Sequence, residues 1–377
     1  MATMASTPRA SVPISHWVGL LGRRDEPADG VEDYCVFLGQ GLAGRGVELQ
    51  RVRVPWMKQG WLGALRGLWS DAAGWRGRWV LVQYTALSWS RRGFPFGALA
   101  VLAVLCRRGV RCAVVFHDPW RHPGTRWIDR VRGACQEWVI RRLYHGARRA
   151  VFCDPLEKIR WLPKNDTKSV FIPIGANIPE RLPQTADGPE RNGAAREVAV
   201  FCLDGTPHRR QQLSDIAQAA RVAAQSGAKL RVIFLGRGTP EARGEIERAF
   251  RGISVEVSNL GLLDAENVSD ALAECDAMLC VRGRLYSRRG SAIAGIACGL
   301  PIIGYGGEAE GTPLAEAGVL LVPYGDAEAL GAGLARVLVD AGFARELRSK
   351  SVQAQQKYFS WDRIAGSYVD VLGTGRD

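Results

Sequence analysis

The chain lacks several of the patterns by which common classes of protein are recognised. Its nine cysteines include no Cys-x-x-Cys pair and mostly lie in apolar runs, which favours reduced, buried thiols in the cytoplasm over a disulfide framework. No group of His, Cys, Asp and Glu has metal-ligand spacing and no Asp-x-Asp occurs, so we expect no metal and no cofactor. The longest apolar run, Phe94 to Cys106, is 13 residues, too short to cross a bilayer, and the first fifteen residues lack a signal-peptide pattern.

Acidic residues are scarce in the first half of the chain. Residues 1–180 hold 27 Lys and Arg against 14 Asp and Glu, a net charge of +13, whereas the remainder carries −1. The same half holds eleven of the twelve tryptophans. Arginine mixed with tryptophan suits the inner, anionic face of the cell membrane, so peripheral contact there is one interpretation. The alternative is an arginine-rich composition with ordinary core tryptophans; nucleic acid is not expected as a partner, because no recognition motif accompanies the charge.

One segment of this basic half is amphipathic. Between residues 56 and 75, Trp61, Leu62, Leu65, Leu68 and Trp69 fall on one face of a predicted helix, with basic residues beside them. Two interpretations stay open. The helix packs on its own domain, or its apolar face dips into a membrane interface.

Short apolar segments alternate with helical patterns along the whole chain, which is typical of an α/β protein with parallel sheets. Six strands are predicted before residue 180 and six after residue 196. The first six cover 16–21, 47–54, 79–84, 111–116, 150–153 and 169–172, and the second six cover 198–203, 230–235, 254–258, 277–281, 301–305 and 319–322.

Two domains are expected, because 377 residues exceed what one hydrophobic core usually supports. We predict a disordered N-terminus over 1–14, a Rossmann-like domain over 15–180, a linker over 181–196 that is rich in Pro, Gly and Asn, and a second Rossmann-like domain over 197–359. Two such domains in tandem are expected to face each other across a cleft, with ligands bound just beyond the carboxyl ends of the strands.

The most informative stretch is residues 287–307, where an Arg-Arg-Gly-Ser sequence opens a run of small apolar residues. Gly290 and Ser291 are predicted to begin a helix, Gly299 to end it, and Ile302 to begin a buried strand. Arg288 and Arg289 then stand at the helix end whose free N–H groups already favour an anion. The interpretation as a diphosphate site competes with that of an Ala/Gly-rich core helix preceded by solvated arginines.

Several segments occur in an order and spacing that resemble a known family. They are Asp29-Gly30-Val31-Glu32-Asp33-Tyr34, Gln83-Tyr84-Thr85, Phe116-His117-Asp118, Phe171-Ile-Pro-Ile-Gly-Ala-Asn177 and Phe359-Ser-Trp361. Together they resemble the family 4 glycosyltransferases, which are retaining enzymes with the two-Rossmann-domain GT-B fold. The resemblance implies an N-terminal domain that binds the acceptor, a C-terminal domain that binds the nucleotide sugar, and a closing segment, 360–377, that returns to the N-terminal domain.

The resemblance also implies roles for individual residues. Arg288, Arg289, Gly290 and Ser291 would bind the donor diphosphate, and Arg209 or Arg210 would stand for a family lysine. On the donor side it adds Gly236 and Glu308, and on the acceptor side Gly30 and Asn177. His117 would contact the sugar or acceptor near the reacting carbon, or be an ordinary hydrogen-bonded loop histidine.

The chain departs from the family at two positions. Most members carry two glutamates eight residues apart, the second of which binds the nucleotide ribose, and here Tyr286 and Ala294 stand at these positions. The Arg-Arg-Gly-Ser version resembles a bacterial subgroup in which this turn replaces the loop of the first glutamate.

These observations predict a metal-independent glycosyltransferase of the hexosyltransferase type. It would move a sugar from a nucleotide sugar to a glycan or lipid-linked acceptor in cell-surface polysaccharide or glycolipid synthesis. The missing glutamates motivate an alternative from another class, a non-catalytic GT-B protein that scaffolds or regulates a polysaccharide pathway.

Overall fold

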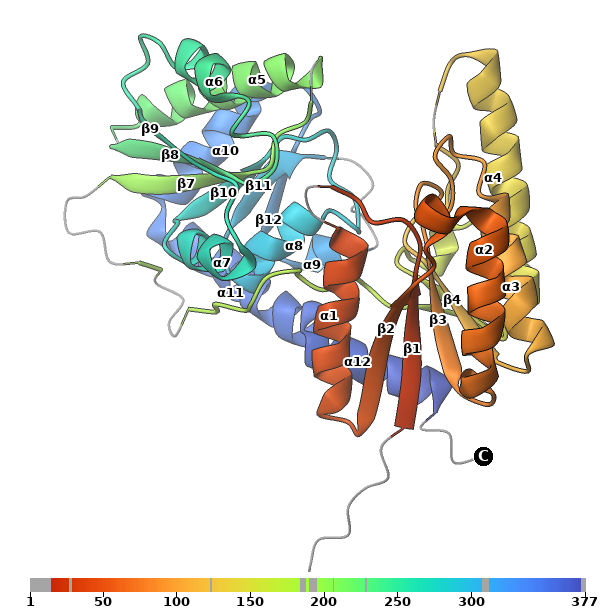
Figure 1. Ribbon diagram of the computed structural model, residues 1–377. Coiled ribbons are helices and arrows are strands. Elements are labelled where there is room, and N and C mark those ends of the chain that lie inside the picture. The colour runs from red at the N-terminus through yellow and green to blue at the C-terminus, as the bar shows by residue number, and fades with distance from the viewer. Residues whose placement is uncertain are drawn as a thin grey trace, which may run out of the picture. The chain divides into compact units, whose positions relative to one another are not determined.

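The computed structural model describes residues 15–26, 29–122, 124–183, 188–189, 195–205, 207–227, 229–306 and 312–373 (Figure 1). The predicted disordered N-terminus, 1–14, and the predicted donor-side residue Glu308 lie outside the described residues. The chain divides into two compact units. The first comprises the described residues of 1–152, 161–172 and 365–377, and the second comprises those of 153–160 and 173–364.

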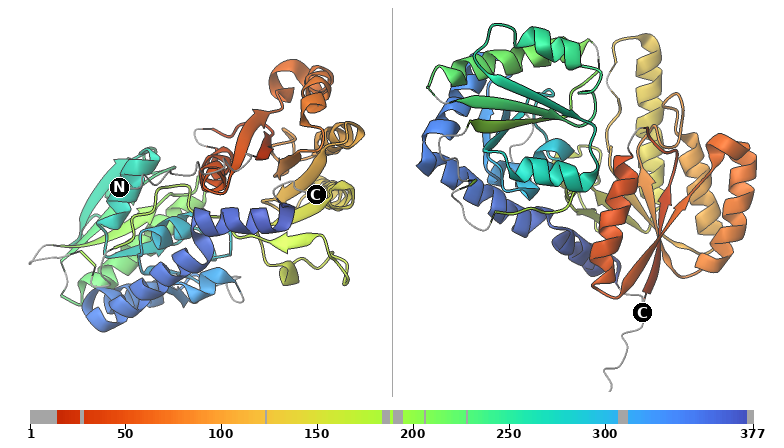
Figure 2. Two further views of the ribbon diagram at one scale, coloured as in Figure 1. Left: turned by 90° about the horizontal axis from the view of Figure 1, so that it is seen from below. Right: turned by 60° about the vertical axis from the view of Figure 1, so that its left-hand side comes forward.

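The first unit is built on a parallel sheet of six strands in the order β2-β1-β3-β4-β5-β6. Its strands are β1 (Ser15–Leu21), β2 (Val47–Arg53), β3 (Trp79–Tyr84), β4 (Arg111–Phe116), β5 (Arg149–Phe152) and β6 (Ser169–Phe171). Its helices are α1 (Gly30–Ala43), α2 (Trp56–Asp71), α3 (Phe96–Arg107) and α4 (Trp127–Gly146), with a short 3₁₀ turn, Ala72–Trp75, after α2. The strand order reverses after β2, so α1 covers one face of the sheet and α2, α3 and α4 cover the other (Figures 1 and 2).

The second unit repeats this plan with the order β12-β11-β10-β7-β8-β9. Its strands are β7 (Arg196–Phe201), β8 (Leu230–Leu235), β9 (Glu256–Gly261), β10 (Ala277–Cys280), β11 (Ile302–Tyr305) and β12 (Val319–Val322). Its helices are α5 (His208–Ala224), α6 (Arg243–Ala249), α7 (Ala265–Ala273), α8 (Gly290–Ala297), α9 (Pro313–Glu316), α10 (Ala327–Val339) and α11 (Ala341–Ala354), with a π-helical turn, Gln355–Phe359, after α11 and a 3₁₀ turn at Leu156–Lys158. Each of the twelve predicted strands is present within a few residues of its predicted bounds.

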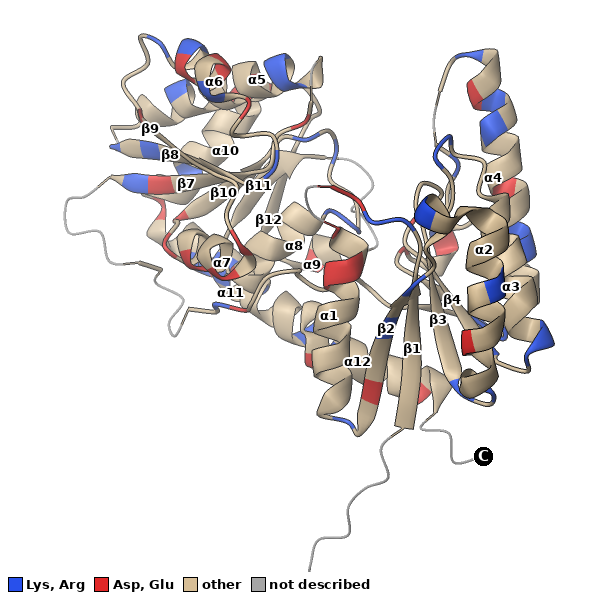
Figure 3. Cartoon of the chain, in the orientation of Figure 1, with Lys and Arg blue, Asp and Glu red and all other residues tan. Residues whose placement is uncertain are grey.

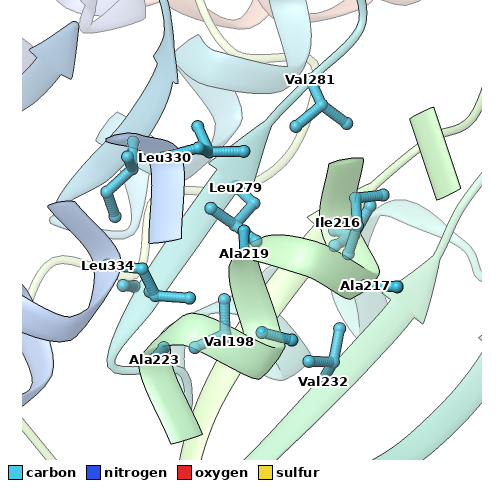
Figure 4. Packing of buried hydrophobic residues seen from close by; sticks show 14 of the residues in the cluster. Val198, Ile216, Ala217, Ala219, Ala223, Val232, Leu279, Val281, Leu330 and Leu334 are labelled. Carbon is cyan, nitrogen blue, oxygen red and sulfur yellow. The ribbon is translucent and has the colours of Figure 1, made fainter. Parts of the chain in front are cut away.

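Each face of the second sheet carries its own hydrophobic core. One core joins α5 and α10 to the central strands through residues such as Ile216, Leu279 and Leu334 (Figure 4). The other joins α7 and α8 to the opposite face and includes Ala176, Ile178 and Phe359. A sheet buried on both faces explains why its strands are continuous apolar runs instead of alternating patterns.

The second of these cores places residues 173–180 and 360–364 in the second unit, whereas the predicted boundaries fell at 180 and 360. The Trp361 indole donates a hydrogen bond to the Ala176 carbonyl at 2.7 Å, and an added Cβ at Gly175 would lie 2.6 Å from the Trp361 ring. Tight packing of this kind holds both segments to the second core. Helix α12 (Trp361–Leu372) thus begins in the second unit.

The rest of α12 belongs to the first unit. The Tyr368 hydroxyl lies 2.8 Å from the Tyr34 hydroxyl, and the Trp79 indole donates to the Leu372 carbonyl at 2.7 Å. Tyr34 and Tyr368 are both almost fully buried. The part of α12 that follows residue 364 therefore packs in the hydrophobic core of the first unit.

Close packing of α10 on α5 gives a first prediction. An added Cβ at Gly331 would lie 2.6 Å from the Val222 Cβ and 2.9 Å from the Ala219 carbonyl oxygen. We expect Gly331→Ala to lower the free energy of unfolding by about 1–3 kcal/mol through overpacking, measured by thermal unfolding. Gly244→Ala on α6 is the matched control, because its Cβ would make only an ordinary 3.6 Å contact with a side chain. It should leave stability unchanged or raise it by about 0.4–1 kcal/mol; equal stability of the two variants would contradict the packing argument.

Candidate functional site

The strand order of the second sheet reverses between β7 and β10, where successive connections depart to opposite faces. Such a switch point leaves a crevice at the carboxyl ends of the two strands, and ligands of α/β proteins bind there. A small hollow of about 10 Å³ lies at this place. It is lined by Val200, Phe201, Cys202, Leu279, Cys280, Val281, Arg282, Leu285, Arg289 and Ser291.

The chain leaves β7 in an unusual conformation. Cys202 has a φ of 68°, and it is the one non-glycine with positive φ among the residues that the structure describes. An L-residue rarely adopts this conformation, and such backbone strain gathers at functional sites. Gly236, at the end of β8, faces the same corner, since an added Cβ would lie 2.6 Å from the Phe201 ring and 2.9 Å from the Cys202 Sγ. The site therefore requires glycine at position 236.

An ion pair lies across the switch point. Arg282, which follows β10, donates to an Asp204 carboxylate oxygen at 2.8 Å, and the Gln212 amide donates to the other oxygen at 2.6 Å. Burial alone would raise the pKa of Asp204, but the positive charge and hydrogen bond of Arg282 together with the Gln212 hydrogen bond outweigh it, so the pKa lies below its ordinary value. Asp204 is therefore ionised at neutral pH.

Arg289 is the second cation of this site and makes few hydrogen bonds. Its side chain is half-buried, and its Nε is buried without a hydrogen-bond partner. One terminal nitrogen donates a long 3.4 Å hydrogen bond to the Arg284 carbonyl, and the guanidinium lies 4.4 Å from the centre of the Tyr286 ring. Burial is the largest influence on the pKa of Arg289 and lowers it, and the nearby positive charge of Arg282 lowers it further. The described part of the chain gives this cation no carboxylate in hydrogen-bonding contact.

Arg288 is placed differently from its neighbour. Its Nε donates to an Asp154 carboxylate oxygen at 2.5 Å, and the Ser287 hydroxyl donates to the other oxygen of the same carboxylate. Asp154 and Ser287 are each 5% exposed. Arg288 thus compensates a buried carboxylate and anchors residues 153–160 to the turn before α8.

The turn leads directly into α8, as predicted. The helix begins at Gly290 and Ser291, and Gly299, with a φ of 67°, follows its end. Its small residues allow close packing, because an added Cβ at Gly295 would lie 2.5 Å from Ile302 and 2.8 Å from the Met278 sulfur. Gly290 is exposed, and Ser291 lines the same hollow as Arg289 at the carboxyl end of β10, so the start of α8 belongs to this site.

The other two predicted donor-side arginines, Arg209 and Arg210, do not line the hollow at the switch point. Arg209 is paired with Glu245 of α6 at 2.7 Å, and its side chain is only 11% exposed. Arg210 is exposed and lines a separate hollow between α5 and α6 with Ser214 and Arg248. Arg282, which follows β10, lies near enough to Arg289 for its charge to lower the pKa of Arg289.

The predicted acceptor-side residues are divided between the two units. His117 follows β4 in the first unit, where its Nε2 lies 2.7 Å from the buried Gln83 side-chain oxygen and its ring meets the Tyr34 ring edge-on at 5.0 Å. Gly30 is the first residue of α1, whose N-cap Asp29 accepts from the Val31 and Glu32 amides. Asn177 lies in the second unit, between two residues of its core, Ala176 and Ile178.

The partly buried hydrogen bond to Gln83 and the contact with the Tyr34 ring hold the His117 side chain in one orientation. A histidine with a fixed ring at the end of a central strand is suited to contact a ligand, although the same bonds suit a structural histidine. Nothing in the described parts of the chain forms a group of three or more His, Cys, Asp or Glu that could hold a metal ion.

Solved structures provide the comparison for this architecture. A sucrose-phosphate synthase from Thermosynechococcus elongatus has a TM-score of 0.66 at 18% identity, covering 95% of this chain and 98% of that one. A glycosyltransferase from Rickettsia africae has a TM-score of 0.66 at 11% identity, with 96% and 99% covered. HepE of Anabaena, solved with UDP and glucose, has a TM-score of 0.64 at 12% identity, with 95% and 99% covered.

The chain has the GT-B fold. The two six-stranded parallel sheets confirm the predicted α/β class with tandem Rossmann-like units. No protein-family model matches the chain, and no curated protein matches it in sequence. At these low identities the comparison establishes the GT-B fold alone.

Within the GT-B fold, sequence reasoning missed the Asp204–Arg282 pair and the Asp154 partner of Arg288. Both Asp204 and Arg282 directly follow predicted strands, so their position was a signal that could have selected them. Asp154 is 134 residues from Arg288, and no local pattern relates the two.

The ion pair gives a pH-dependent prediction. Since Arg282 lowers the pKa of Asp204, the pair stabilises the fold above the ordinary carboxyl value of about 3.9 and loses this effect as the pH falls through the lower folded value. Arg282→Gln should reduce the free energy of unfolding at pH 7 by about 1 kcal/mol or less, because both side chains are about one-third exposed.

Thermal unfolding measured at neutral pH and again at about pH 3, below the ordinary carboxyl value, tests this sign. The difference between wild type and Arg282→Gln should shrink towards acid. A difference that grows as the pH falls would contradict the assignment, and Arg243→Gln, an exposed arginine on α6, is the control expected to show no pH-dependent difference.

Proposed function

We propose that this chain is a retaining, metal-independent glycosyltransferase of the hexosyltransferase type, similar to family 4. In this proposal it works in the cytoplasm and moves a sugar from a nucleotide sugar to a glycan or lipid-linked acceptor. Such a transfer would be a step in the synthesis of a cell-surface polysaccharide or glycolipid. The observation that carries the proposal is the half-buried Arg289 at the switch point of a GT-B unit, which has no carboxylate in hydrogen-bonding contact among the described residues.

A diphosphate would give Arg289 the anionic partner that none of the described residues provides. Two guanidiniums, Arg282 and Arg289, lie near one carboxylate, Asp204, and all three belong to the carboxyl edge of the second sheet. The first N–H groups of α8 add partial positive charge at the same edge. Arginine binds phosphate oxygens in a fork geometry, and HepE, with the same fold, was solved with UDP and glucose.

The same groups would stabilise the charge that develops during sugar transfer. When the sugar leaves, negative charge accumulates on the diphosphate, and fixed donors aimed at it lower the barrier without reorganisation. In the proposed role Arg289, with the N–H groups of Gly290 and Ser291, stabilises this charge, and the leaving diphosphate accepts the proton of the acceptor. His117 would orient the sugar or acceptor, and Gly30 and Asn177 would belong to the acceptor side.

Two features favour the scaffold as a second candidate. Tyr286 covers Arg289 where the family has a glutamate, and Ala294 is 2% exposed where the ribose-binding glutamate is expected. No carboxylate therefore comes from either position for the sugar or ribose. Tight nucleotide binding without sugar transfer would select this alternative.

Nucleotide binding is the direct test of the donor site. UDP, GDP or ADP at millimolar concentration should raise the melting temperature of the wild type, and Arg289→Ala should abolish the rise, because ligand binding stabilises only the folded protein. Arg248→Ala, an exposed arginine on α6, is the matched control and should keep the full shift. If no nucleoside diphosphate shifts the wild type, the donor-site proposal fails.

If transfer is detected in a nucleotide-sugar screen, Arg289→Ala should slow it further than it weakens binding. Removal of one preorganised donor costs roughly 2.7–4 kcal/mol of transition-state stabilisation. Single-turnover rates at saturating donor measure this loss. A variant that transfers as fast as wild type once saturated would leave Arg289 with a binding role only.

Arg288 should behave differently from Arg289 in the unliganded protein. Arg288→Ala leaves the buried Asp154 carboxylate without its cation, and breaking a buried pair in this way costs about 3–5 kcal/mol. The melting temperature without nucleotide should therefore fall for Arg288→Ala and stay close to wild type for Arg289→Ala. The double variant Arg288→Ala with Asp154→Ala should recover part of the loss. Equal unliganded stability of the two single variants would contradict the pairing.

A further inference from the structure

The outward face of α4 carries an unusual set of side chains. Trp127, Val131, Ala134 and Trp138 recur at spacings of four, three and four residues and are all exposed, so they form one stripe along the helix. Trp127 is 74% exposed and Trp138 48%. The opposite face packs in the core of the first unit through Val139, Ile140, Leu143 and other residues. The stripe is therefore not part of the apolar surface that α4 buries when the first unit folds.

The stripe continues onto the neighbouring helix α3, which packs against α4. Phe96, the first residue of α3, is 48% exposed, and its ring meets the Trp138 ring edge-on at 6.1 Å. Three aromatic rings and a valine therefore share one exposed area. Contiguous exposed apolar side chains of this size mark interaction surfaces.

The charge beside the stripe is almost entirely positive. Arg130, Arg141 and Arg142 flank it, and Arg142 also lies 5.4 Å from the centre of the Trp138 ring. Arg141 is paired with Glu137 at 2.6 Å, but Arg130 and Arg142 form no ion pair with any residue that the structure describes. The other carboxylate of the helix, Asp129, is held by Arg126 and Arg132. Figure 3 shows this excess of basic over acidic residues along α4.

We propose that this α4 face, defined by Phe96, Trp127, Val131, Trp138, Arg130 and Arg142, binds the surface of an anionic lipid bilayer. Tryptophan rings lie at the level of lipid headgroups, and arginines beside them are attracted to the negative surface. The helix lies along the interface and does not cross it, since no helix in the described ranges is long and apolar enough to span a membrane.

This assignment moves the membrane contact away from the amphipathic segment 56–75. In α2, Leu68 is buried, and Trp61 stacks on Trp56 and covers Gly97 of α3, so these side chains pack within their own unit. Leu62 and Trp69 are exposed, and the Arg108 guanidinium lies 4.2 Å from the centre of the Trp69 ring. The interpretation that α2 packs on its own domain therefore accounts for most of that segment.

Flotation with lipid vesicles tests the proposal on the full chain. The wild type should bind vesicles of phosphatidylcholine that contain phosphatidylglycerol, bind pure phosphatidylcholine far less, and release at high salt. Arg130→Gln with Arg142→Gln should weaken binding by about fivefold for each arginine removed. Trp127→Ser with Trp138→Ser should weaken it by roughly tenfold or more, since two large apolar contacts are lost.

Matched controls come from exposed residues of the second unit. Arg243→Gln with Arg251→Gln removes the same charge, and Leu262→Ser with Val339→Ser removes exposed apolar side chains (54% and 62%). Both should bind vesicles like the wild type. Binding that ignores phosphatidylglycerol, survives both α4 variants or is lost equally in the controls overturns the proposal, as does binding of duplex DNA without binding of vesicles.

The α4 variants replace exposed side chains, so their melting temperatures should match that of the wild type. The melting shift with UDP in these variants is a separate measurement, because the proposed nucleotide contacts come from the second unit. Failure of the vesicle experiment with an intact nucleotide response would refute the α4 face alone. Failure of the nucleotide response with intact vesicle binding would refute the donor site alone.

Discussion

The reversal of strand order in a parallel sheet is the constraint on which the rest of this structure depends. Right-handed connections require the helices on either side of the reversal to lie on opposite faces of the sheet. Between β7 and β10 this opens the edge where Cys202, Asp204, Arg282 and Arg289 converge. The chain can bring polar and charged groups to this edge because no connecting helix covers it, and the apolar strands behind them remain packed on both faces.

The two neighbouring arginines at this edge, Arg288 and Arg289, differ in the partners of their side chains. Arg288 neutralises the buried Asp154 carboxylate and belongs to the architecture of its unit. Arg289, one residue later, is oriented towards the Tyr286 ring and the Arg284 carbonyl, and within the described ranges its Nε has no hydrogen-bond partner. A cation held in this way costs desolvation free energy that an anionic ligand can offset. Tertiary contacts, and not residue type, distinguish Arg288 from Arg289.

Two helices of the first unit, α2 and α4, differ in where their large apolar side chains lie. Helix α2 follows an amphipathic pattern whose large residues, Trp61 and Leu68, are used for packing within the unit. Helix α4 buries one face and leaves Trp127 and Trp138 exposed on the other, beside arginines. Sequence periodicity identified segment 56–75 as amphipathic, but it does not say which of its apolar residues face a neighbouring helix.

The sequence by itself determined the α/β class, the positions of all twelve strands, and the start and end of α8, because apolar periodicity, glycine and helix-capping preferences act over a few neighbouring residues. Only the tertiary structure decided that Arg209 pairs with Glu245, that Arg288 pairs with Asp154, and that Arg282 stands beside Arg289. The two ion pairs join side chains that are 36 and 134 residues apart in the chain, and Arg282 is held at its place by Asp204, 78 residues away. A local pattern carries no information about such distant partners.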